Sequence, residues 1–172
     1  MIFIELNEAE QKLAEYLGKA RHKNARNRNI EDRQVGPQSA EETGSMGGEL
    51  AGCKYMNVYP DLSIPAEGEL DPADAVLRTG QTVDVKTTPR TKGRLLAALW
   101  KEGEKSCDLY LLMIEEFPRY RVAGFATRDE IFRDETVVDL GHGPVHAIDQ
   151  EFLAMPPLDQ SVEDWQRELD HG

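Results

Sequence analysis

The sequence contains little cysteine, few aromatic residues and a shortage of positive charge. Its 172 residues include 2 cysteines, 7% aromatic residues, and 20 lysines and arginines against 32 aspartates and glutamates. Cys53 and Cys107 stand alone and fit no metal-binding or redox spacing, so we expect two buried thiols. The net charge of -12 argues against a nucleic-acid partner, because strong non-specific DNA binders are usually basic.

Long hydrophobic runs are also absent. No apolar stretch approaches the roughly 20 residues that a membrane-spanning helix needs. The first residues, Met1 to Leu6, lack the basic flank and the long apolar segment of a secretion signal. We therefore expect no membrane partner and a cytoplasmic location. The apolar fraction of 40% and the chain length fit one soluble domain with its own core.

The charge is distributed unevenly along the chain. Basic residues concentrate between Lys19 and Arg33, whereas the tail after Asp149 is mostly acidic. An acidic chain can therefore still present one basic face, on which Arg21 and Arg26 are candidate DNA contacts. The same residues also suit the negative C-terminal end of a helix, and the sequence does not separate the two explanations.

Apolar spacing and turn signals predict an α/β (α+β) fold with a central mixed sheet flanked by helices. We interpret the chain as one domain, in which 1–47 holds the first helix and a polar loop, 48–153 the core, and 154–172 an acidic tail. Residues 95–100 fit either a strand or a short helix. The other expected elements are helices over 7–27 and 49–59, a loop over 29–47, a hairpin over 73–88, strands over 108–114 and 119–125, and a short helix over 127–132.

The hairpin carries the residues with the clearest chemical potential. Thr79-Gly80 marks its turn, and along its second arm Asp84 and Lys86 should share one face, with valines on the other. Asp74 would then lie opposite about position 85, beside both. Two carboxylates suit a hard divalent cation, and the lysine supplies a basic group beside it. A site of this kind can cut phosphodiesters. A solvated strand face with Asp74 capping a turn explains the same spacing.

Further residues extend the hairpin into a longer pattern. The stretches are Gly47-Gly48-Glu49-Leu50-Ala51, Asp74, Asp84-Val85-Lys86-Thr87-Thr88, and the runs 107–114 and 122–130. Together they resemble the PD-(D/E)XK nuclease superfamily, in particular its small single-domain members encoded by phages or prophages. The likeness extends from the first helix to about Leu153. It implies a restriction-endonuclease-like core and hydrolysis of DNA that depends on Mg²⁺ or Mn²⁺.

The resemblance also implies roles for individual residues. Glu49 is similar to the helix-borne acidic residue of the superfamily, Asp74 to its first motif aspartate, Asp84 to its D/E position and Lys86 to its lysine. Asp74, Asp84 and Glu49 would hold the metal, with the Val85 carbonyl as a further ligand. Lys86 would act on the attacking water or on the phosphoryl group.

The first acidic position of the motif is ambiguous. Ala73 precedes Asp74, so the proline in the name of the superfamily is missing there. Asp71, which is followed by Pro72, is the alternative first acid. Hairpin register favours Asp74, because Asp71 would pair near Thr88 and lie further from the lysine.

Basic residues also follow the hairpin. Arg90, Lys92 and Arg94 would contact a phosphate backbone near the site or form a solvated turn.

Two features near the C-terminus have simpler explanations. His142 and His146 have a spacing that suits zinc only on a helix, and the glycines and proline between and beside them break a helix. An apolar stripe of Val162, Trp165 and Leu169 predicts that the tail docks onto the core or onto a second subunit, which would give a homodimer.

Two functions therefore remain open. The first is a Mg²⁺-dependent endo- or exodeoxyribonuclease. The second is a non-catalytic, nuclease-like interaction protein whose carboxylates bind a protein partner or imitate DNA phosphates. Lys86 favours the enzyme, because a binding protein needs no lysine held beside two carboxylates.

Overall fold

The computed structural model of the chain describes residues 1–26, 38–64, 73–99, 106–155 and 162–171. The helices are α1 (Glu8–Arg26), α2 (Gln38–Met56), α3 (Arg128–Ile131) and α4 (Val162–His171). The strands are β1 (Ile2–Glu5), β2 (Ala75–Val76), β3 (Thr82–Thr88), β4 (Leu95–Ala98), β5 (Leu109–Glu116), β6 (Arg119–Thr127), β7 (Val137–Asp139) and β8 (Pro144–Ile148).

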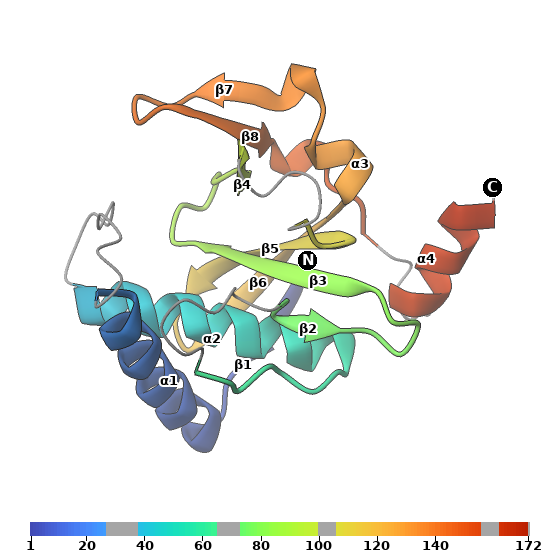
Figure 1. Cartoon of the computed structure of the whole chain (residues 1–172). Helices are drawn as coiled ribbons and strands as arrows, with labels where there is room; N and C mark the ends of the chain where they lie inside the picture. The colour runs from blue at the N-terminus through green and yellow to red at the C-terminus, as the bar shows by residue number, and fades with distance from the viewer. Residues whose placement is uncertain (27–37, 65–72, 100–105, 156–161, 172) are drawn as a thin grey trace.

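A mixed five-stranded sheet of order β1-β6-β5-β3-β2 forms the centre of the fold (Figure 1). Within it β3 and β5 run parallel, and the other neighbours run antiparallel. Helix α2 packs on one face with α1 beside it, and a smaller sheet of order β4-β8-β7 lies with α3 on the opposite side (Figure 1). The predicted fold class, a central mixed sheet flanked by helices, is confirmed.

Local sequence signals set several element ends as expected. The Asn7 Oδ1 atom accepts hydrogen bonds from the backbone of Ala9 and Glu10 at 3.0 Å, which caps α1. Thr127 and Glu130 form the predicted capping box at the start of α3. The strands expected over 108–114 and 119–125 are present as β5 and β6. Residues 95–100, which fitted either a strand or a short helix, contain the strand β4.

The prediction of a polar loop over 29–47 is wrong for residues 38–47. Helix α2 begins at Gln38 rather than at Glu49, so the predicted division of the domain at residue 47 falls inside a helix. Residues 29–37 lie outside the described part of the chain. The helix also ends at Met56 instead of Tyr59, because Asn57 adopts a left-handed conformation with φ of 54° and closes the last turn.

Glycines explain the wrong start of α2. In the sequence, glycines usually indicate that a helix is interrupted. Gly47 and Gly48 instead lie inside α2, where they let the helix approach the sheet closely. A Cβ atom on Gly47 would overlap the Tyr120 hydroxyl, and one on Gly48 would overlap Thr87 Oγ1. The Tyr120 hydroxyl also donates to the Gly44 carbonyl at 3.0 Å. Tertiary contact therefore overrides the low helix propensity of glycine.

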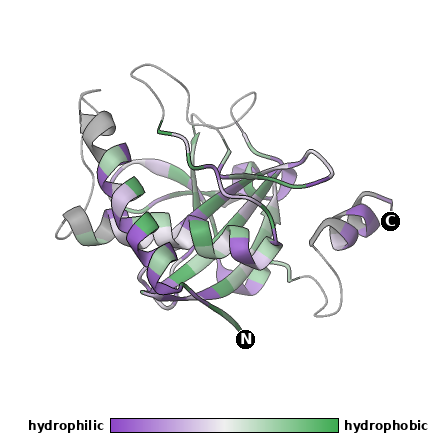
Figure 2. Cartoon of the chain, turned by 90° about the horizontal axis from the view of Figure 1, so that it is seen from below, coloured by the Kyte–Doolittle hydropathy of each residue, from purple (hydrophilic) through white to green (hydrophobic). Residues whose placement is uncertain are grey.

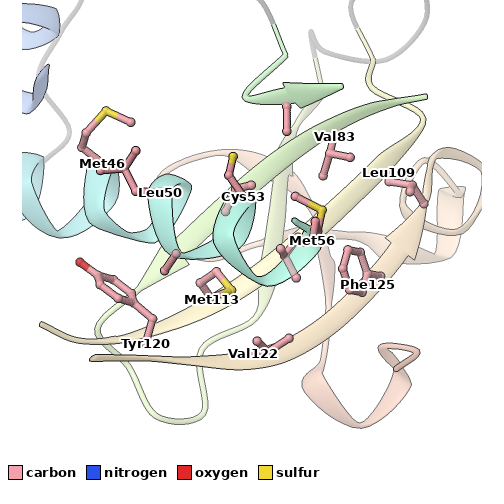
Figure 3. Close-up of a cluster of buried hydrophobic side chains, with 14 of the residues drawn as sticks. Met46, Leu50, Cys53, Met56, Val83, Leu109, Met113, Tyr120, Val122 and Phe125 are labelled. Carbon is pink, nitrogen blue, oxygen red and sulfur yellow. The ribbon is translucent and has the colours of Figure 1, made fainter. Parts of the chain in front are cut away.

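Two apolar clusters lie on opposite faces of the central sheet. The larger lies between the sheet and the helices, and α2 contributes Leu50 and Cys53 to it (Figure 3). The smaller lies between the sheet and the β4-β8-β7 sheet. Cys53 is buried as predicted, whereas Cys107 is only half-buried. No described helix is long and apolar enough to cross a membrane.

Trp165 contacts the core from the C-terminal helix, whereas the side chains of Val162 and Leu169, the other members of the predicted stripe, are outside what the structure describes. Trp165 is buried, and its ring lies 6.0 Å from that of Phe125 in the larger cluster. Much of the rest of α4 is hydrophilic (Figure 2). The expected docking onto the core is therefore present, and the homodimer stays a prediction.

We predict that Gly47→Ala lowers the free energy of unfolding by about 1 to 3 kcal/mol, the usual cost of overpacking a core. The added Cβ would overlap the Tyr120 hydroxyl. Ser45→Ala is the control, because Ser45 is exposed on the same helix and alanine there only improves helix propensity. Urea unfolding measures both variants. Equal stability of the two would contradict the close approach of α2 to the sheet.

Candidate active site

The β2–β3 hairpin closes at the predicted turn. The backbone N–H of Gly80 donates to the Leu77 carbonyl at 2.9 Å, and Gly80 has a φ of 90° that favours glycine. Ala75 pairs with Val83, so the register continues with Asp74 opposite position 84 rather than position 85. Because β2 has only 2 residues, most of β3 has no strand on this side within the described part of the chain.

Asp74 occupies the edge of β3 that β2 leaves open. Its Oδ2 atom accepts a hydrogen bond from the backbone N–H of Val85 at 2.7 Å, in place of a strand partner. A strand residue directs its N–H and C=O toward the same edge, so the Val85 carbonyl also faces this side. The edge therefore presents a carboxylate and a main-chain oxygen next to each other.

Asp84 and Lys86 lie on one face of β3, as the alternation predicts. They stand in register with Tyr110 and Leu112 of β5, which belong to the smaller apolar cluster. Lys86 Nζ lies 2.7 Å from Asp84 Oδ1. Asp84 is only 5% exposed, so the interpretation as a solvated strand face is wrong for this residue.

Glu49 reaches the same region from α2. Its Oε2 atom accepts a hydrogen bond from Arg21 Nη1 at 2.7 Å, and the two side chains are 16% and 24% exposed. The other Arg21 contacts also go to protein, since Nη2 donates to the Asp61 carbonyl and Nε to the Ser63 carbonyl. The guanidinium is thus engaged inside the fold, which the prediction of a DNA contact did not anticipate.

Burial and mutual repulsion raise the pKa values of two of the site carboxyls. Burial is the largest cause for Glu49, and it raises the pKa to about 7 although Arg21 and Lys86 act in the opposite direction. Burial also raises the pKa of Asp74 well above its usual range, with Glu49 and Asp84 adding to the effect. Charges on Asp84 and Lys86 thus act on the pKa values of both Glu49 and Asp74.

Two further residues contact Asp74, and the sequence analysis did not select either of them for the site. The backbone N–H of Asp61 donates to the Asp74 carbonyl at 3.1 Å, and Cys53 Sγ donates to the same oxygen at 3.8 Å. Burial raises the pKa of the Cys53 thiol to about 12, which keeps it neutral. These contacts hold the start of β2 against α2.

The remaining predicted DNA contacts are dispersed. Arg90 and Lys92 are exposed in the turn that follows β3. Arg94 pairs instead with Asp149, at 2.6 Å between Nε and Oδ1. Arg26 ends α1, and its side chain is outside what the structure describes. Asp71, the alternative first acid, also lies outside the described residues.

His142 and His146 do not lie on a helix, in agreement with the prediction that the glycines and the proline break one. His146 lies in β8 and His142 in the preceding turn, where Gly141 and Gly143 have positive φ angles of 94° and 95°. The buried His146 Nδ1 atom lies 2.8 Å from Thr136 Oγ1.

The carboxylates fit an open magnesium site better than a closed metal cage. In the described part of the chain, no group of three or more His, Cys, Asp and Glu side chains is arranged to hold a metal ion. Mg²⁺, however, commonly takes one or two carboxylates and completes its shell with water and substrate oxygens. Asp74, Asp84 and the Val85 carbonyl offer such ligands, and a cation would offset the burial and the repulsion that raise the pKa of Asp74.

Comparison of the chain with family models, curated proteins and solved structures gives no match. The resemblance to the PD-(D/E)XK superfamily therefore stays a prediction from the sequence.

We predict that the contribution of Glu49 to stability falls as the pH rises from about 4.5 to 7, and that Glu49→Gln makes the change in unfolding free energy between pH 5 and 8 less negative by about 2 kcal/mol. Because the folded state raises the pKa of Glu49 to about 7, it binds more protons than the unfolded state in this range. Urea unfolding in a chelator at both pH values measures the effect. Glu15→Gln is the exposed control, and equal slopes for the two variants would contradict the prediction.

Proposed function

We propose that the protein is a metal-dependent nuclease that hydrolyses DNA phosphodiester bonds. One observation carries this proposal: the Asp74 carboxylate binds the N–H of Val85, Asp84 and Lys86 flank Val85 on β3, and Glu49 of α2 acts electrostatically on Asp74. Burying carboxylates together is costly unless cations or ligands offset them. Structural stability alone gives no reason to keep such a set.

The side chains would divide the work between holding the cation and acting on the substrate. Asp74 and Asp84 would bind the cation with the Val85 carbonyl, and Glu49 would assist directly or through water. When bound, Mg²⁺ or Mn²⁺ would polarise the phosphate and lower the pKa of a water molecule. Lys86 Nζ, held 2.7 Å from Asp84, would orient that water or stabilise charge on the phosphoryl oxygens.

The approach of DNA to the site depends on local positive charge. The net charge of -12 disfavours non-specific binding. Arg90 and Lys92 are exposed in the turn after β3, the strand that carries Asp84 and Lys86, and would supply local phosphate contacts. We infer a cytoplasmic enzyme of phage or prophage type, in keeping with the family resemblance.

A second candidate is a non-catalytic interaction protein built on the same fold. The observation in its favour is that the site carboxylates already have partners inside the protein. Asp84 pairs with Lys86, Glu49 with Arg21, and Asp74 with the Val85 N–H. Such a protein would bind its partner without a metal and without cleaving DNA.

A metal titration tests the first step of the proposal. We expect Mn²⁺ to stabilise the wild type by about 2.7 kcal/mol at a hundredfold excess over Kd. Asp84→Asn should lose this stabilisation, because it removes an anionic ligand. Asp129→Asn is the control, since Asp129 is exposed on α3. Thermal unfolding with and without Mn²⁺ provides the measurement.

A cleavage panel tests the reaction itself. Duplex, single-stranded and branched DNA, and RNA, are incubated with Mg²⁺ or Mn²⁺. We expect Lys86→Met to bind the cation as the wild type does but to cleave at least about 100-fold more slowly. Lys12→Met, at an exposed position of α1, is the control. If no substrate is cut and no cation binds, the nuclease proposal fails and the interaction protein is favoured.

A further inference from the structure

Arg21 joins three segments of the chain at the site. From α1, its Nη1 atom binds Glu49 Oε2 at 2.7 Å, its Nη2 atom binds the Asp61 carbonyl at 2.7 Å, and its Nε atom binds the Ser63 carbonyl at 3.2 Å. The first acceptor lies on α2, and the other two lie on the strap 57–64 that follows it. A guanidinium suits this role, because it offers several donors in a fixed plane.

The peptide unit of Asp61 continues this link to the hairpin. Its carbonyl accepts from Arg21, and its N–H donates to the Asp74 carbonyl at 3.1 Å. Asp74 in turn accepts from the Val85 N–H through its carboxylate. A continuous chain of hydrogen bonds therefore runs from Glu49 through Arg21 and Asp61 to Asp74.

We propose that Arg21 is a positioning residue of the active site, which fixes Glu49 and Asp74 relative to each other without touching the substrate. The catalytic purpose of this positioning rests on the proposed function. The positioning itself is a property of the metal-free protein. It also gives Arg21 a different role from a phosphate contact, because its described donors point to Glu49 and to the strap.

The simpler alternative is that Arg21 only fastens α1 to α2. Lys54 provides the matched control, because its Nζ atom joins the same two helices through Glu10 Oε2 at 2.8 Å. It also donates to the Glu5 carbonyl at 3.0 Å. Lys54→Gln therefore removes a helix–helix ion pair of similar length without touching the site carboxylates.

Amide hydrogen exchange of the metal-free protein tests the positioning directly. We expect Arg21→Gln to increase the exchange rates of the Asp61 and Val85 amides at least about tenfold, since both report on the placement of Asp74. Lys54→Gln should leave them unchanged. Arg21→Lys restores a charge beside Glu49, but one ammonium cannot reproduce the planar fork, so the Asp61 amide should still exchange fast. Unchanged rates in Arg21→Gln would overturn the inference.

Metal and DNA measurements separate positioning from DNA contact. We expect Arg21→Gln to raise the Kd for Mn²⁺ about tenfold and to lower kcat with little change in KM, whereas Lys54→Gln changes neither. A rise in KM with a salt dependence weaker by about one charge would instead identify a phosphate contact and refute our inference. If the wild type neither binds Mn²⁺ nor cuts DNA, the proposed function fails, and the exchange rates alone decide whether Arg21 positions Asp74.

Discussion

The arrangement of the protein around β3 depends on one constraint, which is that carboxylates buried together need compensating partners. Asp84 has Lys86, Glu49 has Arg21, and Asp74 has the backbone N–H of Val85. Each partner comes from a particular element, so the constraint also determines how the elements around the site are arranged. It requires that α1 lies against α2, that β2 begins only after Asp74, and that the chain after α2 returns toward the hairpin. Without these partners the desolvation cost of each anion would oppose folding.

The close contact between α2 and the sheet is what brings Glu49 near enough to influence Asp74. Leu50 and Cys53 anchor the helix in the larger apolar cluster (Figure 3), and Glu49 directly precedes Leu50 in the sequence. Gly47 and Gly48 allow the approach, because side chains there would overlap Tyr120 and Thr87 of the sheet. Core packing and the geometry of the site are therefore set by the same few residues of one helix.

Sequence signals predicted those structural features that depend on residues close together in the chain. The cap at Thr127, the turn at Gly80 and the alternation along β3 are local, and the structure contains all three. The start of α2 was mispredicted, because whether a glycine breaks a helix depends on distant residues that pack against it. The engagement of Arg21 was missed for the same reason. Its spacing from Leu17 on the buried stripe of α1 was the available signal, since a charge on such a stripe needs a partner.

The short β2 strand has a consequence for the behaviour of the protein in concentrated solution. A sheet edge without a neighbour exposes backbone groups that pair readily with a strand of another molecule. On β3 this edge is occupied by Asp74, which takes up the Val85 N–H and places a carboxylate where an incoming strand would lie. Asp74, which we propose as a metal ligand, would therefore also protect this edge against pairing with a strand of another molecule.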